Sequence, residues 1–298
     1  MLLPPVSCAL LDPDFTFWVL LPISFDKLVE ELSGRNFWGD LDHDPFVQIL
    51  NLGVVSGFIF NDARERESML AILSPAKSLN TDLTVERSGI TSPQFLKQAA
   101  ELAEMMRGFS PSNLAVLMKL SDKLSALNAA RFEEWNVDHQ SNDLLPAVYA
   151  FNGDVYQGLD VQTLEADALD RLSERVRILS GLYGILRPFD AMRPYRLEMG
   201  TRLRGQAVSS LPDFWRIPVT ESLNELLEGR PLVNLASNEY AAAVDFKSIN
   251  GPVISPVFKD RKNGEYKIIS FYAKRARGSM ARFMVESDAR TMDDLKQF

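Results

Sequence analysis

From Met69 onward, short apolar runs alternate with stretches of helical periodicity, and this alternation narrows the possible folds more than any other feature of the sequence. The run at 69–75 ends in Ser-Pro and is typical of a buried strand. Ser-Pro pairs at 92–93 and 110–111 each supply an N-cap and a first helical residue, so a helix is expected after each pair. Further elements are predicted as strands at 147–154 and 231–237 and as a helix at 164–181. Strands mixed with helices in this way predict a single domain of the mixed α/β (α+β) class.

The pair Asn263-Gly264 marks the clearest local element, a β-hairpin. Asn-Gly fits the two-residue turn that joins antiparallel strands with their natural twist. The predicted strands are 253–260 and 265–273. The second strand is expected to carry Phe271 and Tyr272 and to continue directly into a basic segment, "SFYAKRARGSMARF", at 270–283.

The first 68 residues differ in charge from the rest of the chain. They contain 4 Lys or Arg against 11 Asp or Glu, whereas residues 69–298 contain 28 against 29, so nearly all of the net charge of −8 belongs to the first quarter. The alternating Arg and Glu at 64–67 fit translation of a purine-rich ribosome-binding stretch, which makes Met69 the expected true start. The alternative is that 1–68 is a small N-terminal appendage. Either way, the domain boundary is predicted between residues 68 and 69.

Composition excludes several classes of protein and of site. The apolar runs at 15–25 and 49–60 are shorter than the roughly 20 residues that a bilayer-spanning helix needs, so no membrane association is expected. The one cysteine, Cys8, cannot form an intrachain disulfide, and a reducing, cytoplasmic location is expected. Two histidines, His43 and His139, are too few for zinc fingers or three-histidine metal centres. No resident metal or cofactor is therefore expected, and a weak iron site would have to use oxygen ligands. The candidate oxygen ligands are Asp154, Glu198, Glu239 and Asp245.

Two segments are rich in basic residues. Residues 171–204 carry 8 basic and 3 acidic groups, and residues 261–282 carry 7 and 1. Because the rest of the domain must then be acidic, the pattern predicts one basic face that binds an anion. Arginine in the irregular, Gly- and Pro-rich stretch 179–205 suits phosphate, since its planar fork donates two hydrogen bonds at once. The alternative is scattered surface charge, with some arginines paired internally to Asp190 and Glu198.

Two short helices joined by a tight turn at 110–135 are a further candidate for phosphate binding. Backbone N–H groups at the helix starts and the side chains of Lys119, Lys123 and Arg131 would be available there. The turn lacks the paired glycines of typical phosphate-binding helical hairpins, so an ordinary structural hairpin is the alternative.

Polar side chains gather at predicted strand ends. Lys77 follows the first strand, Asp154 closes the strand at 147–154, and Glu239 follows the strand at 231–237. Because strand ends in mixed folds are frequent positions of active sites, these three are candidates for an acid, a base or an electrophile. Helix capping and turn formation are the alternative roles of the neighbouring Asn and Ser.

Six blocks of the sequence resemble, in order, the signature segments of the YaaA family of peroxide stress resistance proteins. The blocks are "SPAKSL", "SDKLSALNAARF", "FNGDVYQGL", "SGLYGILRPFDAMRPYRLEMGTRL", "VNLASNEY" and "PVFKDRKNGEYKIISFYAKRARGSMARF". The resemblance covers residues 69–298 and implies a cytosolic bacterial protein that protects DNA during peroxide stress by limiting unincorporated intracellular iron. It also implies a mixed fold peculiar to the family, with a basic cleft and a helix–hairpin–helix-like element that binds DNA, for which 110–135 is the best match.

The chain departs from the family at both ends. Residues 1–68 have no counterpart in the family, and members continue past the position where this chain ends in "DDLKQF". A peripheral strand is therefore expected to be missing at the C-terminal edge.

Three functions stay open. The first is a monomeric stress protein that contacts the phosphates of duplex or structured DNA with little sequence specificity. The second is an enzyme that acts on a nucleic acid or a phosphorylated substrate through Lys77, Asp154 and Glu239, and the third is an iron binder. The residues expected to contact DNA are Lys119, Lys123, Arg131, Arg187, Arg193, Arg196, Lys274, Arg275, Arg277 and Arg282.

Overall fold

A computed structural model gives the structure of the protein. It describes residues 6–10, 19–23, 68–81, 83, 89–138, 144–203, 207–208, 210–262 and 265–298. The chain forms two compact units, Met1–Ala63 and Arg64–Phe298. In the first unit, β1 (Val6–Leu10) and β2 (Val19–Ile23) pair antiparallel. The start at Met69 and the boundary after residue 68 stay predictions.

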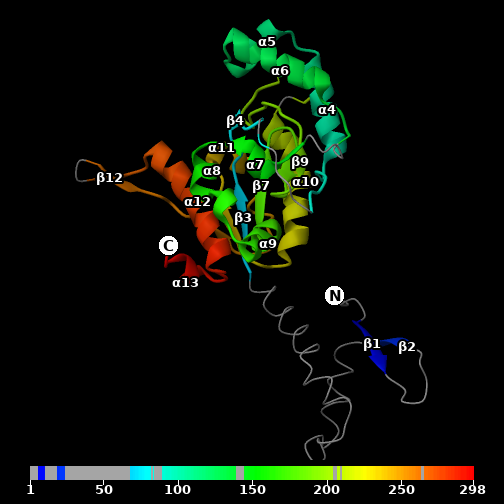
Figure 1. The fold of residues 1–298 in the computed structure, drawn as a ribbon, viewed down its shortest axis with the longest axis vertical. Helices are drawn as coiled ribbons and strands as arrows, with labels where there is room; N and C mark the ends of the chain where they lie inside the picture. The colour runs from blue at the N-terminus through cyan, green and yellow to red at the C-terminus, as the bar shows by residue number, and fades with distance from the viewer. Residues whose placement is uncertain are drawn as a thin grey trace, which may run out of the picture. The chain divides into compact units, whose positions relative to one another are not determined.

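A five-stranded mixed sheet lies at the centre of the larger unit (Figure 1). Its order is β11-β10-β3-β7-β8, in which the first four strands are parallel and β8 runs antiparallel to β7. The strands are β3 (Leu70–Leu73), β7 (Val176–Ser180), β8 (Gly184–Leu186), β10 (Leu232–Leu235) and β11 (Val253–Ile254). Every residue of β3 and β7 is buried, as expected for inner strands of a sheet that is covered on both faces. The mixed α/β class and the strands predicted at 69–75 and 231–237 are confirmed.

The predicted strand at 147–154 is mostly wrong. Residues Ala147–Ala150 form a short helix, α7, and only Phe151–Asn152 is extended, as β6, which pairs with β4 (Ser78–Leu79). The first two N–H groups of α7 donate to the carbonyls of Asp190 and Pro188, each at 2.9 Å. These bonds are long-range, so the local sequence does not reveal them.

The predicted helix at 164–181 is two elements. Helix α9 (Ala166–Arg175) ends where β7 begins at Val176. A short apolar run does not by itself distinguish a buried strand from a helix, and here the sheet decides. The buried Arg177 side chain closes the end of α9, since its Nη1 donates to the carbonyl of Ser173 at 2.8 Å. Burial lowers the pKa of Arg177 to about 10, which still leaves the guanidinium charged at neutral pH.

Three helices follow β3 and β4 in the chain and lead away from the central sheet (Figure 1). They are α4 (Leu96–Arg107), α5 (Pro111–Met118) and α6 (Asp122–Glu134). The Ser110 hydroxyl accepts from Asn113 N at 3.3 Å and caps α5, which confirms the signal at 110–111. The Ser-Pro pair at 92–93 precedes α4, but the helix starts three residues later than the pattern predicts.

Helix α10 (Leu211–Leu227) packs Trp215 into the core beside β8. Gly184 lies directly beneath the indole ring with φ of +71°, so a Cβ there would overlap Trp215. The indole Nε1 donates to the carbonyl of Gly181 at 3.0 Å, which satisfies its buried N–H. Gly181 and Gly184 therefore help to pack Trp215 into the core.

Helix α8 (Asp154–Leu159) crosses α12 (Ser270–Glu286) at two glycines. A Cβ on Gly278 would collide with the carbonyl of Val155, and one on Gly158 would collide with the carbonyl of Arg275. The two backbones are thus in direct contact at this point. On the other side of α12, the chain continues to a last short helix, α13 (Met292–Leu295), whose capping box joins Thr291 and Asp294.

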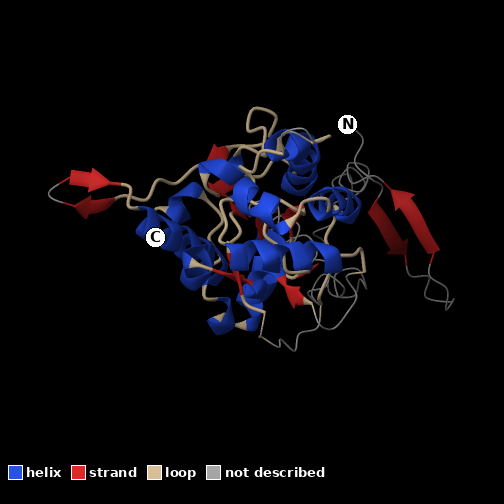
Figure 2. Cartoon of the chain, turned by 90° about the horizontal axis from the view of Figure 1, so that it is seen from above, coloured by secondary structure: helices blue, strands red, loops and turns tan. Residues whose placement is uncertain are grey.

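The predicted hairpin is confirmed, but its strands are shorter than predicted. Strands β12 (Asp260–Lys262) and β13 (Glu265–Lys267) pair antiparallel and project from the body of the unit (Figures 1 and 2). The turn residues Asn263 and Gly264 lie outside the described residues. Residues 253–254 belong to the central sheet as β11, and Phe271 and Tyr272 lie in the first turn of α12 instead of in a strand. No helix in the described part of the chain is long and apolar enough to cross a membrane.

Candidate nucleic-acid interface

The carboxyl ends of β3, β7 and β10 meet at one edge of the sheet. Of these three parallel strands β3 comes first in the chain, and β7 and β10 lie on opposite sides of it, so the strand order reverses at β3. Such a switch point is the usual position of ligand sites in parallel sheets. Ser74 joins the turn after β3 to the turn after β10, because its Oγ accepts from Ser237 N at 2.8 Å.

Lys77, one of the predicted site residues, belongs to a small charged group at this edge. Its Nζ lies 2.6 Å from Oε2 of Glu198, and Oε1 of Glu198 accepts from Arg196 Nη2 at 2.9 Å. Lys77 is exposed, whereas Arg196 and Glu198 are mostly buried. The group, called here the Glu198 cluster, holds two cations against one carboxylate.

The other two catalytic candidates do not join this cluster by an ion pair in the described part of the chain. Glu239 Oε1 accepts from Gly200 N at 2.9 Å, and Asp154 is the first residue of α8. The phenol of Tyr240 is buried near Glu239 and Glu198, and its pKa is raised, first by burial and then by Tyr195, Glu239 and Glu198. Tyr240 is therefore a neutral hydroxyl at this edge. A shared role of Lys77, Asp154 and Glu239 in acid–base chemistry stays a prediction.

The carboxylates suggested for iron do not gather into one site. Glu198 and Glu239 have the partners given above, and Asp245 Oδ2 accepts from the Ser248 hydroxyl at 2.8 Å. Across the described ranges, no three His, Cys, Asp or Glu side chains are placed to hold a metal ion. His139 and Arg204 lie outside those ranges.

Two arginines of the stretch 179–205, called here the Arg-rich segment, donate hydrogen bonds to other residues of the protein. Arg187 Nε donates to the buried Asp190 at 3.0 Å, and its Nη2 donates to the carbonyl of Ser92 at 2.8 Å. Arg193 Nη2 donates to Asn136 Oδ1 at 2.9 Å and to the carbonyl of Asp138 at 2.7 Å, which attaches the chain after α6 to this segment. Internal pairing, the alternative weighed above, therefore describes Arg187 and Arg196, while Arg193 has a structural partner that the sequence did not suggest.

Helix α12 divides its basic residues into two groups. Beyond Gly278, Arg282 Nη1 donates to the carbonyl of Asp160 at 2.9 Å and to Thr163 Oγ1 at 2.8 Å, and its Nη2 lies 2.6 Å from Glu286. Before Gly278, Lys274 and Arg275 are exposed and Arg277 is half-buried. These three cations form no hydrogen bond or ion pair with any residue that the structure describes. Burial lowers the pKa of Arg277, which still keeps its charge at neutral pH.

Helix α8 connects the first half of α12 to the edge of the sheet. The Tyr156 hydroxyl donates to the carbonyl of Ser74 at 3.1 Å, while Gly158, two residues later, abuts the carbonyl of Arg275. Helix α8 thus links the backbone of α12 at Arg275 to the turn after β3, three residues before Lys77. In Figure 1, α12 runs from the projecting hairpin past β3 to α13.

The helices α5 and α6 form the predicted helical hairpin. Lys119 ends α5 in the left-handed conformation, with φ of 52°, and the Ser121 hydroxyl caps α6. Lys119 and Lys123 are exposed, and burial lowers the pKa of the half-buried Arg131. The left-handed position is occupied by lysine where a phosphate-binding hairpin usually has glycine, and contact with phosphate stays a prediction.

Sequence reasoning missed three exposed cations in or beside the β12–β13 hairpin. Lys259, Arg261 and Lys267 all lie at the surface, and Lys267 is 2.6 Å from Glu265. The 7-to-1 ratio of basic to acidic residues in 261–282 was the available signal. This ratio covers the hairpin as well as the helix.

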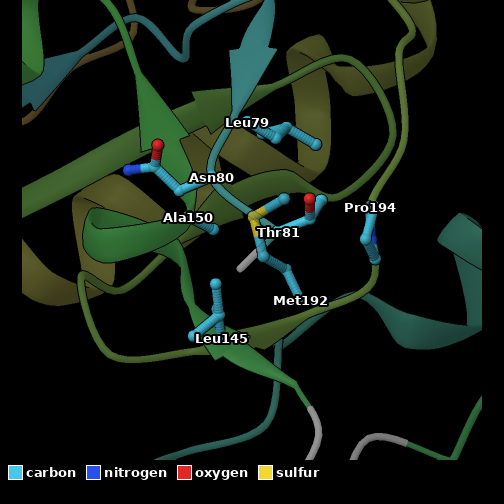
Figure 3. Close-up of a pocket in the computed structure, with 7 residues that line it drawn as sticks. All are labelled: Leu79, Asn80, Thr81, Leu145, Ala150, Met192 and Pro194. Atoms are coloured by element: carbon cyan, nitrogen blue, oxygen red, sulfur yellow. The ribbon is translucent and has the colours of Figure 1, made fainter. Parts of the chain in front are cut away.

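A pocket beside the Arg-rich segment does not provide an alternative anion site. Figure 3 shows its lining, which is mostly apolar. The lining residues are Leu79, Asn80, Thr81, Leu145, Ala150, Met192 and Pro194. None of them is charged, so the pocket offers nothing that would bind a phosphate strongly.

Comparison with known proteins matches most of the chain. A family model described as "Peroxide stress protein YaaA" matches residues 69–298. A UPF0246 protein of Idiomarina loihiensis is 52% identical over 233 residues, which cover 77% of this chain and 90% of that protein. A UPF0246 protein of Pseudoalteromonas translucida is 48% identical over 233 residues, with 77% and 90% covered, and one of Shewanella oneidensis is 47% identical over 233 residues, with 77% and 91% covered.

Proposed function

The chain belongs to the YaaA family of peroxide stress proteins, and on that premise we propose that it binds DNA through the first half of α12. The observation that carries the proposal is the set of three cations before Gly278, Lys274, Arg275 and Arg277, that no described acid neutralises. A cation without an internal partner loses no existing ion pair when it contacts a phosphate. Its full charge is therefore available for binding.

The surroundings of these cations are also basic. Residues 257–277 contain 7 Lys or Arg against 2 Asp or Glu, whereas the whole chain is acidic. Phosphate contacts of this kind position a protein on DNA without reading its sequence. We therefore expect affinity for duplex or structured DNA, a steep dependence on salt, and little preference for sequence. The α5–α6 hairpin, with Lys119 and Lys123, is a second surface that could contact phosphates.

A direct test is binding of a fluorescein-labelled duplex as salt is raised from about 50 mM, since each phosphate contact contributes about 0.9 to the log–log slope. The variant Lys274→Gln/Arg275→Gln should reduce the slope by about 2 and weaken binding at low salt. The matched control Lys97→Gln/Lys247→Gln removes two exposed lysines from other elements and should leave both values unchanged. Absence of binding at the lowest salt, or an affinity that salt does not change, would contradict the proposal.

The family resemblance also implies a limit on unincorporated intracellular iron, and we propose that role together with DNA binding. We expect this effect to depend on the DNA-binding surface of α12. Cells that lack the protein, complemented with wild type or with Lys274→Gln/Arg275→Gln, can be compared by electron paramagnetic resonance of chelated iron under peroxide. Equal iron levels in the two complemented strains would separate the two roles.

A second candidate function is an enzyme that acts on a nucleic acid or a phosphorylated substrate. It draws on the position of the Glu198 cluster at the switch point of the sheet. Lys77→Met should abolish any turnover of labelled oligonucleotides or phosphate esters while DNA binding persists. Turnover that survives this change would remove Lys77 from the mechanism.

A further inference from the structure

The hairpin arm exposes large apolar side chains beside its cations. The arm is defined here as residues 257–262 and 265–272, which include β12, β13 and the first turn of α12. Tyr266 is 70% exposed, Phe271 49% and Tyr272 54%, and the aliphatic Ile268 is 62% exposed. Exposed apolar groups gathered in one place usually mark a binding surface.

The pairing of the two strands places a ring and a cation on the same face. In the register of β12 and β13, Arg261 lies directly opposite Tyr266. Residues that face each other across an antiparallel pair point to the same side of the sheet. The acids of the arm, Asp260 and Glu265, occupy the neighbouring positions and therefore point to the other side. One face of the hairpin thus combines an aromatic ring with positive charge and carries no acid within the paired positions.

The first turn of α12 repeats this combination. Phe271 and Tyr272 meet edge to face, with ring centroids 5.5 Å apart. On a helix, Phe271 shares a face with Lys274 and Arg275, which follow it by three and four residues. Two aromatic positions therefore adjoin the cations that are proposed to bind phosphate.

We propose that the arm binds unpaired bases of DNA, which stack on Tyr266, Phe271 and Tyr272 while the neighbouring cations contact the backbone. This inference rests on the proposed function, because it assumes that the chain binds DNA. A positively charged surface with interleaved aromatic rings is the combination that binds single strands without reading sequence. In a duplex the faces of the bases are stacked on one another, so only unpaired bases can use the rings.

The charge of the arm favours a nucleic acid over an apolar protein surface. A protein partner that covered these rings would also have to leave Arg261, Lys274 and Arg275 in contact with acids or solvent. A DNA strand supplies a ring and a negative charge at every nucleotide, which matches the alternation of rings and cations on the arm. The substrate class is therefore DNA with single-stranded, gapped or bulged segments.

The experiment compares an oligothymidylate of about 20 nucleotides with a fully paired duplex of the same length, by fluorescence anisotropy on the full chain. The variant Phe271→Leu/Tyr272→Leu keeps apolar volume but removes both rings. It should weaken binding of the single strand by about 5- to 150-fold, the range for loss of one stacked base, and leave duplex binding unchanged. Tyr266→Phe keeps the ring and should bind as the wild type does, and Ile217→Ala, an exposed aliphatic on α10, is the control.

Photocrosslinking of the bound oligothymidylate should attach thymine to the peptide that contains Tyr266, Phe271 and Tyr272. The inference is overturned if Phe271→Leu/Tyr272→Leu binds both DNAs as tightly as the wild type does. This is also the result expected if the arm binds a protein partner instead of DNA. Equal weakening of single-strand and duplex binding also overturns the inference, because the rings can stack only on unpaired bases and their loss should not affect the duplex. An oligouridylate that binds more tightly than the oligothymidylate overturns the assignment to DNA. If the wild type and the leucine variant bind the duplex equally and also bind the single strand equally, the inference fails and the proposed function stands. If the wild type binds neither DNA, both fail.

Discussion

The two basic segments of the chain have similar compositions but differ in how many of their cations have acceptors within the protein. In the Arg-rich segment, Arg187, Arg193 and Arg196 all donate to acceptors of the protein. In α12, the cations before Gly278 have no partner among the described residues, whereas Arg282 after it is bound on several sides. The density of basic residues therefore identifies a surface available for binding only when the acceptors around those residues are known.

The largest expected effect comes from separating α12 from α8. Gly278→Leu would drive a side chain into the carbonyl of Val155, and we expect it to destabilise the protein by about 3 kcal/mol or more, the upper range for overpacking. Urea unfolding measures this loss. Ser279→Ala, one position later, removes only a 3.4 Å bond to the carbonyl of Gly158 and should cost less than about 1 kcal/mol. If Gly278→Leu is tolerated, α8 and α12 are not in direct backbone contact at Gly278.

The next prediction concerns the Arg-rich segment. Arg187→Met leaves the buried Asp190 without its guanidinium and should destabilise the protein by about 1–3 kcal/mol. The measurement is the free energy of unfolding in urea, with DNA affinity measured on the folded variant. We expect the affinity to change less than in Lys274→Gln/Arg275→Gln. A larger loss of affinity in Arg187→Met would reverse the comparison between the segments.

Within α12, a matched pair of substitutions tests the division at Gly278. Arg282→Gln removes donors to Asp160, Thr163 and Glu286 and should cost about 1–2 kcal/mol of stability. Arg275→Gln should cost less than about 0.5 kcal/mol, because the side chain is exposed and has no described partner. Thermal and urea unfolding of both variants give the values. Similar losses in the two would mean that Arg275 is also structural.

The smallest expected effect is a dependence on pH. Burial raises the pKa of Asp190 above its ordinary value, against the opposing bonds from Thr91 and Arg187. Since the folded state holds this proton more tightly than the unfolded state, the linked stability is present below the unfolded pKa and is lost as pH rises through the raised folded pKa. Asp190→Asn should remove this component, so the stability difference between wild type and variant should fall as pH rises through that window. A difference that grows with pH would contradict the assignment.

Local signals in the sequence predicted several elements correctly. The first strand ended at Ser-Pro, Ser110 capped its helix, and Asn-Gly lay between two paired strands. Each of these depends on residues within a few positions of one another. Where local pattern left a choice, it failed: Val176–Ser180 continued the apolar spacing of a helix but became the strand beside β3.

The candidate site divides along the same line. The pairs Arg187–Asp190 and Arg196–Glu198 are only three and two residues apart, and the sequence suggested both as possible internal pairs. The bonds of Arg193 to Asn136 and of Lys77 to Glu198 join residues that are far apart in the chain, and nothing local suggested them. The exposed rings of Phe271 and Tyr272 were also missed, because both were assigned to a strand that in fact ends at Lys267.

By itself the sequence determined the class of fold, the start of α5, the hairpin and the two segments in which basic residues concentrate, since all of these follow from short-range patterns of charge, capping and hydrophobicity. Only the tertiary structure decided which of those cations remain available. A guanidinium binds whatever acceptor comes within about 3 Å, and for Arg193 and Arg282 the acceptors are brought there by other elements of the fold. The free charge of the first half of α12 is thus a consequence of what packs beside it: α8 touches its backbone at Arg275 and Gly278 and brings no acid to its cations.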